Sequence, residues 1–312
     1  MLRSRPFPIL SSILALAILL GEGVSARPAH AVAGGIGDLF VTSDASNLTR
    51  AYTGMTGNYL GVFAPAVNAT GFLGLHFGAT NDRALVGAFG GGVDEYDANT
   101  GAYIKTYNPG GGAQWAGIYR PNGNVFIGSW NTQDVREYDG TTGAFIRVLF
   151  PMVDPADMEY GPNGHLYVCS YGSYKVIELD EVTGIPYNFI NLPFGERAND
   201  VAFLPGGRIL VTAMGMNQCY VFDSALNLIN MFAGTGWQRP HGVVISPHTG
   251  NILIADGVTT QVHEFDPNTY AELNANFLTP GPNDKIVDVA FRPDHPTASA
   301  PSTWGRVKAL WR

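Results

Sequence analysis

Short stretches in which apolar and polar side chains alternate recur along most of the chain, and glycine, proline or asparagine residues bound each of them. Such runs predict β-strands joined by tight turns. Five of the runs end in an aspartate, and these aspartates follow one another at intervals of 42, 41, 43 and 43 residues: Asp97, Asp139, Asp180, Asp223 and Asp266. A period of about 42 residues is the length of a four-stranded propeller blade.

Each repeat contains the same succession of predicted strands. The first strand is apolar and ends in a three-residue motif, which is an aromatic or aliphatic residue followed by any residue and then by proline, as in Tyr160-Gly161-Pro162. A glycine-containing turn then leads to a second apolar strand, and the third strand ends at the recurrent aspartate, which can accept hydrogen bonds from the turn after it. A fourth, outer strand completes the unit. The pattern extends back to a sixth unit, in which Thr53 replaces the aspartate.

The first unit begins at residues 37–41, which match a second strand, and no inner strand precedes them. Near the other end of the chain, residues 286–291 match an inner strand, but no second strand follows them. Pairing of these two segments would close the ring and remove the open sheet edge. We therefore expect an all-β fold over residues 37–296, namely a six-bladed β-propeller of four-stranded antiparallel blades, closed by pairing the C-terminal strand into the first blade.

The two ends of the chain differ from the repeats. Arg3 and Arg5 precede an apolar segment and then small residues, which is the pattern of a signal peptide over residues 1–26, with cleavage after Ala26 or, as a second choice, after Ala31. We expect a secreted or periplasmic protein without a transmembrane segment, because the apolar run is too short to span a bilayer. Residues 297–312 are expected to form a linker and a short basic, aromatic tail.

Charge and cysteine content restrict the partners. The formal net charge is −8, and the 18 Lys and Arg residues are scattered, so a nucleic-acid partner is not expected. Cys169 and Cys219 fall on unmatched strands of adjacent units, which favours two buried free thiols over a disulfide. We expect a monomer that binds a small molecule or a protein or peptide.

The candidate site follows from the way a propeller arranges its inner strands around a central channel. Residues four positions before the recurrent aromatic form one ring: Leu73, Trp115, Ala156, Asn199, His241 and Val287. The next position forms another: Gly74, Ala116, Asp157, Asp200, Gly242 and Asp288. We therefore expect a ligand-binding mouth, with Ca²⁺ or another divalent cation as a candidate cofactor, that is formed by Trp115, Asp157, Asn199, Asp200, His241 and Asp288. Alternatively, the aspartates cap backbone amides of neighbouring strands and His241 fills the channel.

Two segments carry a resemblance to known families. Residues 239–257 resemble an NHL repeat, with Pro240-His241-Gly242 on the inner strand, a Gly250-Asn251 turn and an Ala255-Asp256 ending. Residues 196–203 are similar to the metal-binding strand of SMP-30/gluconolactonase-type propellers of the TolB-like superfamily. That resemblance implies a metal site in which Asn199 takes part with Asp157 or Asp200, although the Glu-Gly-Pro motif of the family has no counterpart here. The setting of His241 also resembles that of the catalytic histidine in virginiamycin B lyase.

These observations support three hypotheses about function. The first is an exported, NHL-like binding or protein-interaction module that uses the channel mouth. The second is a metal-dependent hydrolase, lactonase or lyase that acts on a small molecule, with His241 as general base. The third is a structural protein of the cell envelope.

Overall fold

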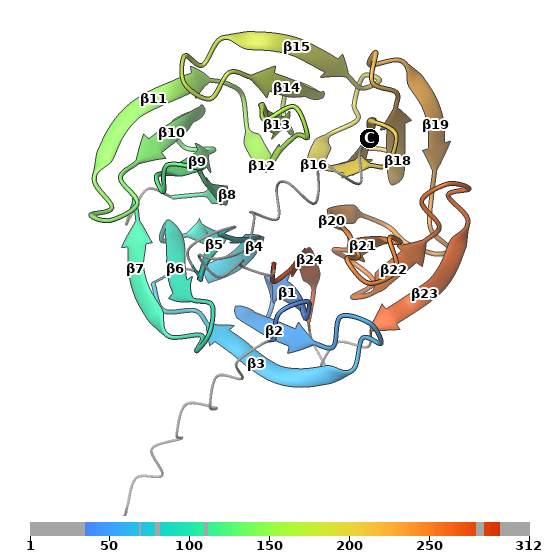
Figure 1. Ribbon diagram of the computed structural model, residues 1–312, viewed down its shortest axis with the longest axis horizontal. Helices are drawn as coiled ribbons and strands as arrows, with labels where there is room; N and C mark the ends of the chain where they lie inside the picture. Colours follow the sequence, from blue (N-terminus) through green and yellow to red (C-terminus); the bar gives the residue numbers. More distant parts are fainter. Residues whose placement is uncertain (1–34, 69, 79–81, 109–111, 279–283, 294–312) are drawn as a thin grey trace, which may run out of the picture. The chain divides into compact units, whose positions relative to one another are not determined.

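A computed structural model describes residues 35–68, 70–78, 82–108, 112–278 and 284–293, which are coloured in Figure 1. The predicted signal peptide, residues 1–26, and the predicted tail, residues 297–312, lie outside the described residues. Within them the chain forms twenty-four strands and no helix. In this part of the chain, therefore, no helix exists that could cross a membrane.

The strands repeat in groups of four. The inner strands are β4 (Thr70–Phe77), β8 (Gln114–Tyr119), β12 (Pro155–Tyr160), β16 (Ala198–Leu204), β20 (Pro240–Ile245) and β24 (Ile286–Phe291). The second strands are β1 (Leu39–Ser43), β5 (Arg83–Gly90), β9 (Val125–Ser129), β13 (Leu166–Ser170), β17 (Arg208–Ala213) and β21 (Ile252–Asp256). The third strands are β2 (Leu48–Tyr52), β6 (Val93–Asp97), β10 (Asp134–Tyr138), β14 (Lys175–Leu179), β18 (Gln218–Phe222) and β22 (Val262–Phe265). The outer strands are β3 (Tyr59–Pro65), β7 (Tyr103–Tyr107), β11 (Phe145–Pro151), β15 (Pro186–Asn191), β19 (Leu228–Phe232) and β23 (Glu272–Leu278).

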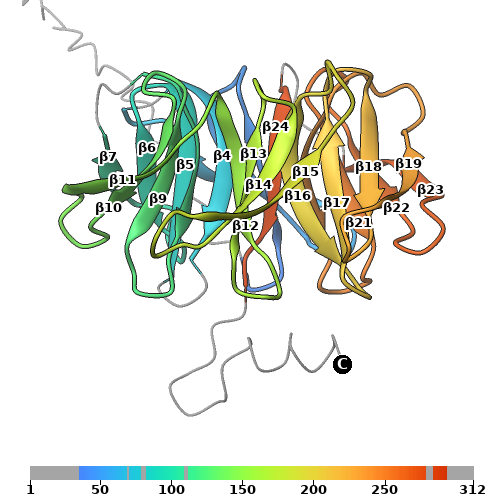
Figure 2. The same cartoon turned by 90° about the horizontal axis from the view of Figure 1, so that it is seen from above.

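The sheets are antiparallel and stand around a central axis in a propeller arrangement (Figure 1). Four of them have four strands each, and one has eight. The eight-stranded sheet contains β4 to β7 and β8 to β11, which are joined at the pair Ala88 and Gln114. Seen from the side, the strands run roughly along the axis (Figure 2). The inner strands therefore line a channel.

Contacts between inner strands run in the order β4, β8, β12, β16, β20 and β24, and β24 in turn contacts β4. The last strand, β24, pairs antiparallel with β1, with Val289 opposite Val41. These two segments are the ones whose pairing the sequence predicted. The expected sheet edge of β1 is thus covered by a strand about 250 residues later in the chain.

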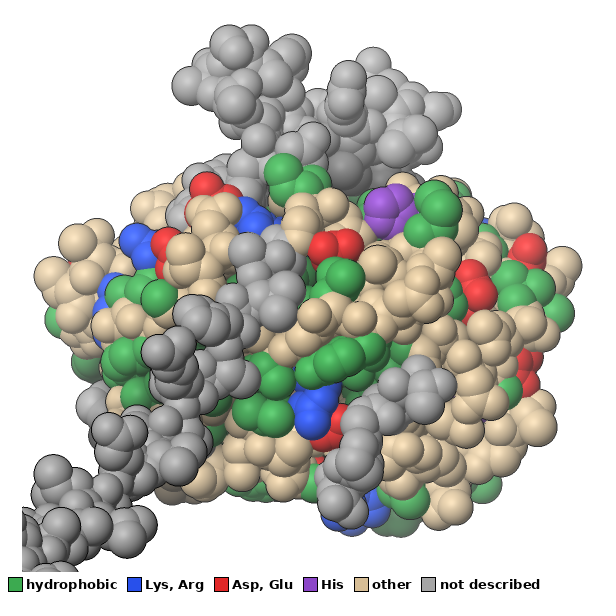
Figure 3. All heavy atoms as spheres, turned by 90° about the horizontal axis from the view of Figure 1, so that it is seen from below, with side chains coloured by type: hydrophobic (Ala, Val, Ile, Leu, Met, Phe, Trp, Pro, Cys, Tyr) green, Lys and Arg blue, Asp and Glu red, His purple; other side chains and the backbone are tan. Residues whose placement is uncertain are grey.

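Apolar side chains from neighbouring sheets pack between them. Phe40 on β1 contacts Phe63 on β3 and Phe77 on β4, with ring centroids 4.9 and 4.8 Å apart. Cys169 and Cys219 are buried and free, so they contribute to this packing as small apolar side chains. Outer strands also expose apolar groups, among them Tyr59 and Leu60 of β3. On the side shown in Figure 3, exposed apolar side chains are interspersed with charged and polar ones.

The recurrent aspartates stabilise turns. The Asp139 carboxylate accepts hydrogen bonds from the amides of Thr141 and Thr142, at 3.0 and 2.7 Å, and from the Thr142 hydroxyl at 2.9 Å. Asp97, Asp180 and Asp266 make the same set of bonds. These donors lower the pKa of Asp139 because they favour the ionised carboxylate. The aspartates with the strongest sequence signal therefore hold the turn between third and outer strands and lie away from the channel.

Candidate functional site

A β-bulge lies at the start of the inner strands, where the candidate residues are found. In β20, for example, Pro240 pairs with Asp256 and the next pair joins Val243 and Ile254, so two residues of the inner strand stand opposite one residue of β21. Comparable register shifts occur at residues 73–74, 115–116, 156–157, 199 and 287. A bulge interrupts the alternation of side chains between the two faces of a strand. It therefore allows consecutive residues, such as Asn199 and Asp200, both to contribute to the channel.

The structure divides the predicted set between two cavities that have no lining residue in common. The first, which we call the aromatic cavity, has a volume of about 230 Å³ and is lined by Asp44, Leu73, Phe89, Trp115, Trp130, Tyr171, Met214, Arg239, His241, Gly257 and Val287. The second, which we call the acidic cavity, has a volume of about 240 Å³. It is lined by Asp157, Asp200, Asp288, His76, Glu159 and apolar residues further along the inner strands. One mouth was expected for six residues, because adjacent ring positions were treated as a single layer: Trp115, Asp157, Asn199, Asp200, His241 and Asp288. The structure places Trp115 and His241 in the aromatic cavity and the three aspartates in the acidic cavity, and Asn199 belongs to neither lining.

His241 is the central polar group of the aromatic cavity. Its ring lies parallel to that of Trp115, with an interplanar angle of 7° and a centroid distance of 5.6 Å. Its Nδ1 atom lies 3.0 Å from the Asn199 Nδ2 atom. Because an amide nitrogen can only donate, Nδ1 accepts this bond and the neutral ring carries its proton on Nε2. Burial and, to a lesser degree, the nearby Arg239 charge lower the pKa of His241 to about 3, so the ring is neutral and a weak base at pH 7.

Aromatic side chains form the wall beside His241. Trp115 and Trp130 stack with a centroid distance of 5.0 Å, and the Trp130 indole N–H donates to the Pro155 carbonyl at 2.8 Å. Phe89 meets both tryptophans edge-on and remains 46% exposed. Tyr171 lies against the same pair, with centroids 5.9 and 5.3 Å away. The hydrogen bond and the mutual stacking hold this wall in one arrangement.

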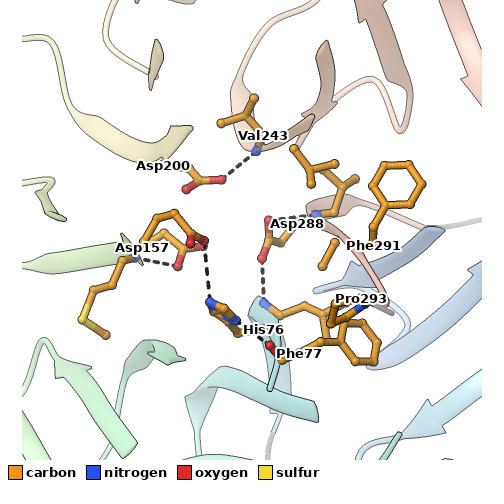
Figure 4. A pocket seen from close by; sticks show the side chains of 14 residues that line it. His76, Phe77, Asp157, Asp200, Val243, Asp288, Phe291 and Pro293 are labelled. Carbon is orange, nitrogen blue, oxygen red and sulfur yellow. Dashed lines mark hydrogen bonds and ion pairs between the residues drawn. The ribbon is translucent and has the colours of Figure 1, made fainter. Parts of the chain in front are cut away.

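Three aspartates converge in the acidic cavity, as Figure 4 shows. Asp157, Asp200 and Asp288 each place a carboxylate oxygen within 4.8 Å of the other two. Asp200 accepts from the amides of Val201 and Val243, both at 2.6 Å, and thereby links β16 to β20. A side chain at Gly242 would overlap the Asp288 carboxylate, since a Cβ atom there would lie 1.9 Å from Oδ1. The glycine thus leaves room for the carboxylate.

Asp288 and Asp157 differ in the number of hydrogen bonds that their carboxylates accept. Asp288 accepts from Leu75 at 2.6 Å and from Val289 at 2.7 Å, which links β24 to β4. Asp157 accepts only from the Met158 amide, at 2.7 Å, among the described residues. Its second oxygen is therefore the one most available to a ligand. The capping of backbone amides, one of the two roles that the sequence left open, is therefore observed for all three aspartates.

Desolvation controls the ionisation of the acidic cavity. Burial raises the pKa of Asp157 to about 7 and that of Glu159 to about 8. It raises the pKa values of Asp200 and Asp288 well above the usual range, and the neighbouring carboxylates add to the effect. Burial lowers the pKa of His76, whose Nε2 lies 3.6 Å from Glu159, to about 4. The carboxylates consequently retain protons near neutral pH unless a cation balances them.

The oxygen cluster fits a calcium ion in type and in span. Calcium takes carboxylate oxygens, and two calcium–oxygen bonds of about 2.4 Å each reach across at most about 4.8 Å, and the three oxygens lie within 4.8 Å of one another. Of the predicted metal set, Asp157 and Asp200 belong to this cluster, and Asp288 completes it. Asn199 instead donates to His241, and its Oδ1 is buried without a hydrogen-bond partner in the described part of the chain.

Several lining residues were missed by the sequence analysis, although the sequence contains a signal for them. His76 and Glu159 come two positions after ring residues Gly74 and Asp157, and side chains two apart along a strand face the same side. In the aromatic cavity, one group of residues directly follows the second strands: Asp44, Trp130, Tyr171, Met214 and Gly257. Extending the repeat alignment into those loops would have identified this additional ring.

Comparisons with known proteins bear on the fold. No protein-family model matches the chain, and no curated protein sequence matches it. A chain in the crystal structure of a nidogen/laminin complex is similar over 83% of this chain and 99% of its own length, with a TM-score of 0.69 and 14% identity. A protein of unknown function from Bacteroides caccae is similar over 84% of this chain and 98% of its own, with a TM-score of 0.59 and 13% identity. Likeness at this level of identity supports the β-propeller fold.

Proposed function

We propose that the chain is an exported six-bladed β-propeller of the NHL and SMP-30-like group within the TolB-like superfamily. The six-fold recurrence of the repeat supports this count, if β4 to β7 and β8 to β11 are taken as two blades joined by one strand pair. Pairing of β24 with β1 supports ring closure. We further propose that the signal peptide, residues 1–26, directs a monomeric propeller of residues 37–296 out of the cytoplasm.

The proposed activity is binding, through the aromatic cavity at one mouth of the channel. The observation that carries this proposal is the neutral His241 ring, which is only 6% exposed and lies flat against Trp115 at the base of a preformed cavity. Preformed, mainly apolar cavities with a few fixed polar groups are the usual form of a small-molecule site. A protein partner is a second possibility, because the similar nidogen/laminin structure contains a complex of two proteins.

Loops around the same mouth add apolar surface. Phe194 precedes the inner strand β16 and is 93% exposed, and Met216, between β17 and β18, is 68% exposed. Val153 and Val258, in the corresponding loops before β12 and after β21, are also exposed. Exposed apolar groups that surround a cavity favour a partner with apolar surface of its own.

A thermal-shift screen with a small-molecule and peptide library tests the proposal. The screen compares the wild-type protein with Trp115→Ala and with His241→Ala, and uses His165→Ala, which alters a half-exposed side chain stacked on Tyr187 of β15, as a matched control. We expect compounds that stabilise the wild type and the control to lose their effect on both channel variants. Binding that is equally strong in all four proteins would refute a role for this cavity.

The second candidate function is a cation-dependent hydrolase or lyase, favoured by the convergence of three carboxylates in the acidic cavity. A bound Ca²⁺ or another divalent cation would supply Lewis-acid chemistry there, held by Asp157, Asp200 and Asp288. Melting temperatures with calcium, zinc and EDTA, together with turnover assays on lactones and esters, test this function. An unchanged melting temperature and no turnover across the panel would eliminate it.

A further inference from the structure

The size and lining of the aromatic cavity restrict the ligand, if the proposed binding function is correct. A cavity of about 150 Å³ lined by apolar side chains is enough to hold benzene, whereas this one measures about 230 Å³. It therefore has room for one or two fused rings. Leu73, Met214 and Val287 supply aliphatic surface beside the Trp115 and Phe89 rings in the same lining, so a flat ring system would meet mainly apolar atoms.

One hydrogen-bond donor faces this apolar space. His241 is only 6% exposed, and its Nδ1 atom accepts a hydrogen bond from the Asn199 side-chain amide. Its Nε2 has no hydrogen-bond partner among the described residues, while the ring lines the cavity. A ligand oxygen placed against Nε2 would accept a hydrogen bond from it in mainly apolar surroundings, where such a bond is stronger than in bulk water.

The mouth offers hydrogen-bond donors to a ligand oxygen. Arg239 lines the cavity and is exposed, and both its charge and that of Lys285 act on Asp44, the one carboxylate in the lining. The Arg197 guanidinium also lies 4.7 Å from the centre of the Tyr171 ring at the same mouth. Asp256 acts on His241 and Asp154 on Arg197, so the mouth carries charges of both signs, and Arg239 is the lining cation that can pair with an anionic group. A sugar fits less well, because the polar atoms lie on one side of an otherwise apolar lining.

We propose that the aromatic cavity binds a small planar aromatic compound bearing an oxygen acceptor, a carboxylate or a carbonyl, whose rings lie along the Trp115 wall and whose oxygen accepts from His241 Nε2. Arg239 completes the recognition of an anionic group at the rim. The acidic cavity takes no part in this binding.

Isothermal titration with three matched compounds tests the proposal. 2-Naphthoate has flat rings and a carboxylate, 2-naphthylmethylammonium has the same rings with the opposite charge, and decalin-2-carboxylate retains the carboxylate without flat rings. We expect 2-naphthoate to bind at least tenfold more tightly than either of the others. Equal affinity for the ammonium compound, or for the decalin, would overturn the assignment.

Variants locate the binding. We expect His241→Phe, which keeps a flat ring and removes the donor, to weaken 2-naphthoate binding at least tenfold, while His165→Phe leaves it unchanged. If His241→Phe fails to fold, ¹⁵N NMR of the wild-type imidazoles decides, since 2-naphthoate must shift the His241 Nε2 resonance. An unshifted resonance, or unchanged affinity in a folded His241→Phe variant, refutes the proposal. If library compounds still depend on Trp115 and His241 but 2-naphthoate does not bind, only the ligand class is wrong and the binding function stands.

Discussion

The two cavities of this propeller lie along one channel and are built from adjacent positions of the same strands, yet their chemistry is opposite. Trp115 and His241 make the first cavity mainly aromatic, whereas Asp157, Asp200 and Asp288 make the second an oxygen-rich cluster. In the first, a histidine is held neutral by burial, and in the second, carboxylates are held protonated by burial. Burial has the same electrostatic effect in both, because it disfavours the charged form of either group.

A repeat fold can thus vary the chemistry of its channel from one strand position to the next on the same backbone. The bulges let neighbouring residues of an inner strand both contribute to the channel, as Asn199 and Asp200 do. A substitution at one position then changes one cavity and leaves the other intact. The four predictions below test this independence.

The largest effect is expected from Asp288→Ala. This change removes the acceptor of two backbone amides, those of Leu75 and Val289, where β24 meets β4. Leaving both amides without a partner should reduce the free energy of unfolding by about 3 kcal/mol, since each costs roughly 1 to 3 kcal/mol and some carboxylate repulsion is relieved. Urea unfolding measures the change, with Asp139→Ala in an exposed turn as the control. A midpoint no lower than that of the control would show that Asp288 does not join the strands.

The next largest effect is expected from calcium. A cation bound by the three carboxylates stabilises the folded state by mass action, by about 2.7 kcal/mol when its concentration is a hundred times the dissociation constant. We expect the melting temperature of the wild type to rise with calcium, and that of Asp157→Asn to respond much less. Binding of ligands in the aromatic cavity should not change in this variant. A calcium response of equal size in both proteins would place the ion elsewhere.

A smaller effect concerns pH. Burial raises the pKa of Asp157 in the folded protein to about 7, above its ordinary value of 3.8, so the folded state binds more protons than the unfolded chain between these values. Stability should therefore fall as the pH rises through this range. Asp157→Asn has no titrating group at this position and should not lose this stability. The melting temperature of the variant minus that of the wild type should therefore increase from pH 5 to pH 8. A constant difference across that range would mean that the carboxyl titrates normally.

The smallest effect is expected outside both cavities, from Asp180→Asn. The donors of the following turn and Tyr187 lower the pKa of Asp180, and the group is exposed. The stabilisation that it provides is present above the unfolded pKa and is lost as the pH falls. We expect a slight decrease in melting temperature at pH 7 that disappears at acidic pH. Calcium and aromatic ligands should bind this variant as they bind the wild type.

Much of the fold could be predicted because its signals are local and repeated. Alternation of apolar and polar residues indicated the strands, and the recurrent aspartates indicated the turns that they do stabilise. The pairing of residues 286–291 with the first sheet could also be predicted, because one repeat lacked an inner strand that another segment supplied.

The sequence could predict which residues belong to the candidate site but not how they are arranged. The ring positions led to Trp115, Asp157, His241 and their neighbours, which do line the channel. Their division between two cavities was not predicted, since a repeat alignment gives the order of residues along a strand but not the direction of consecutive side chains at a bulge. Phe89 and Tyr171 were also missed, because they come from the end of a second strand and from the loop after another, outside the inner strands.

The repeat, the strand pattern and the residue types near the axis depend on spacing along one chain, and they could therefore be predicted from the residues alone. Which of those residues meet depends on how the strands are arranged in three dimensions. The bulges turn Asp157, Asp200 and Asp288 toward one another and bring His241 against Trp115 from a strand three blades away. Such contacts join groups that are far apart in the chain, and their energies depend on burial and distance, which no local pattern records.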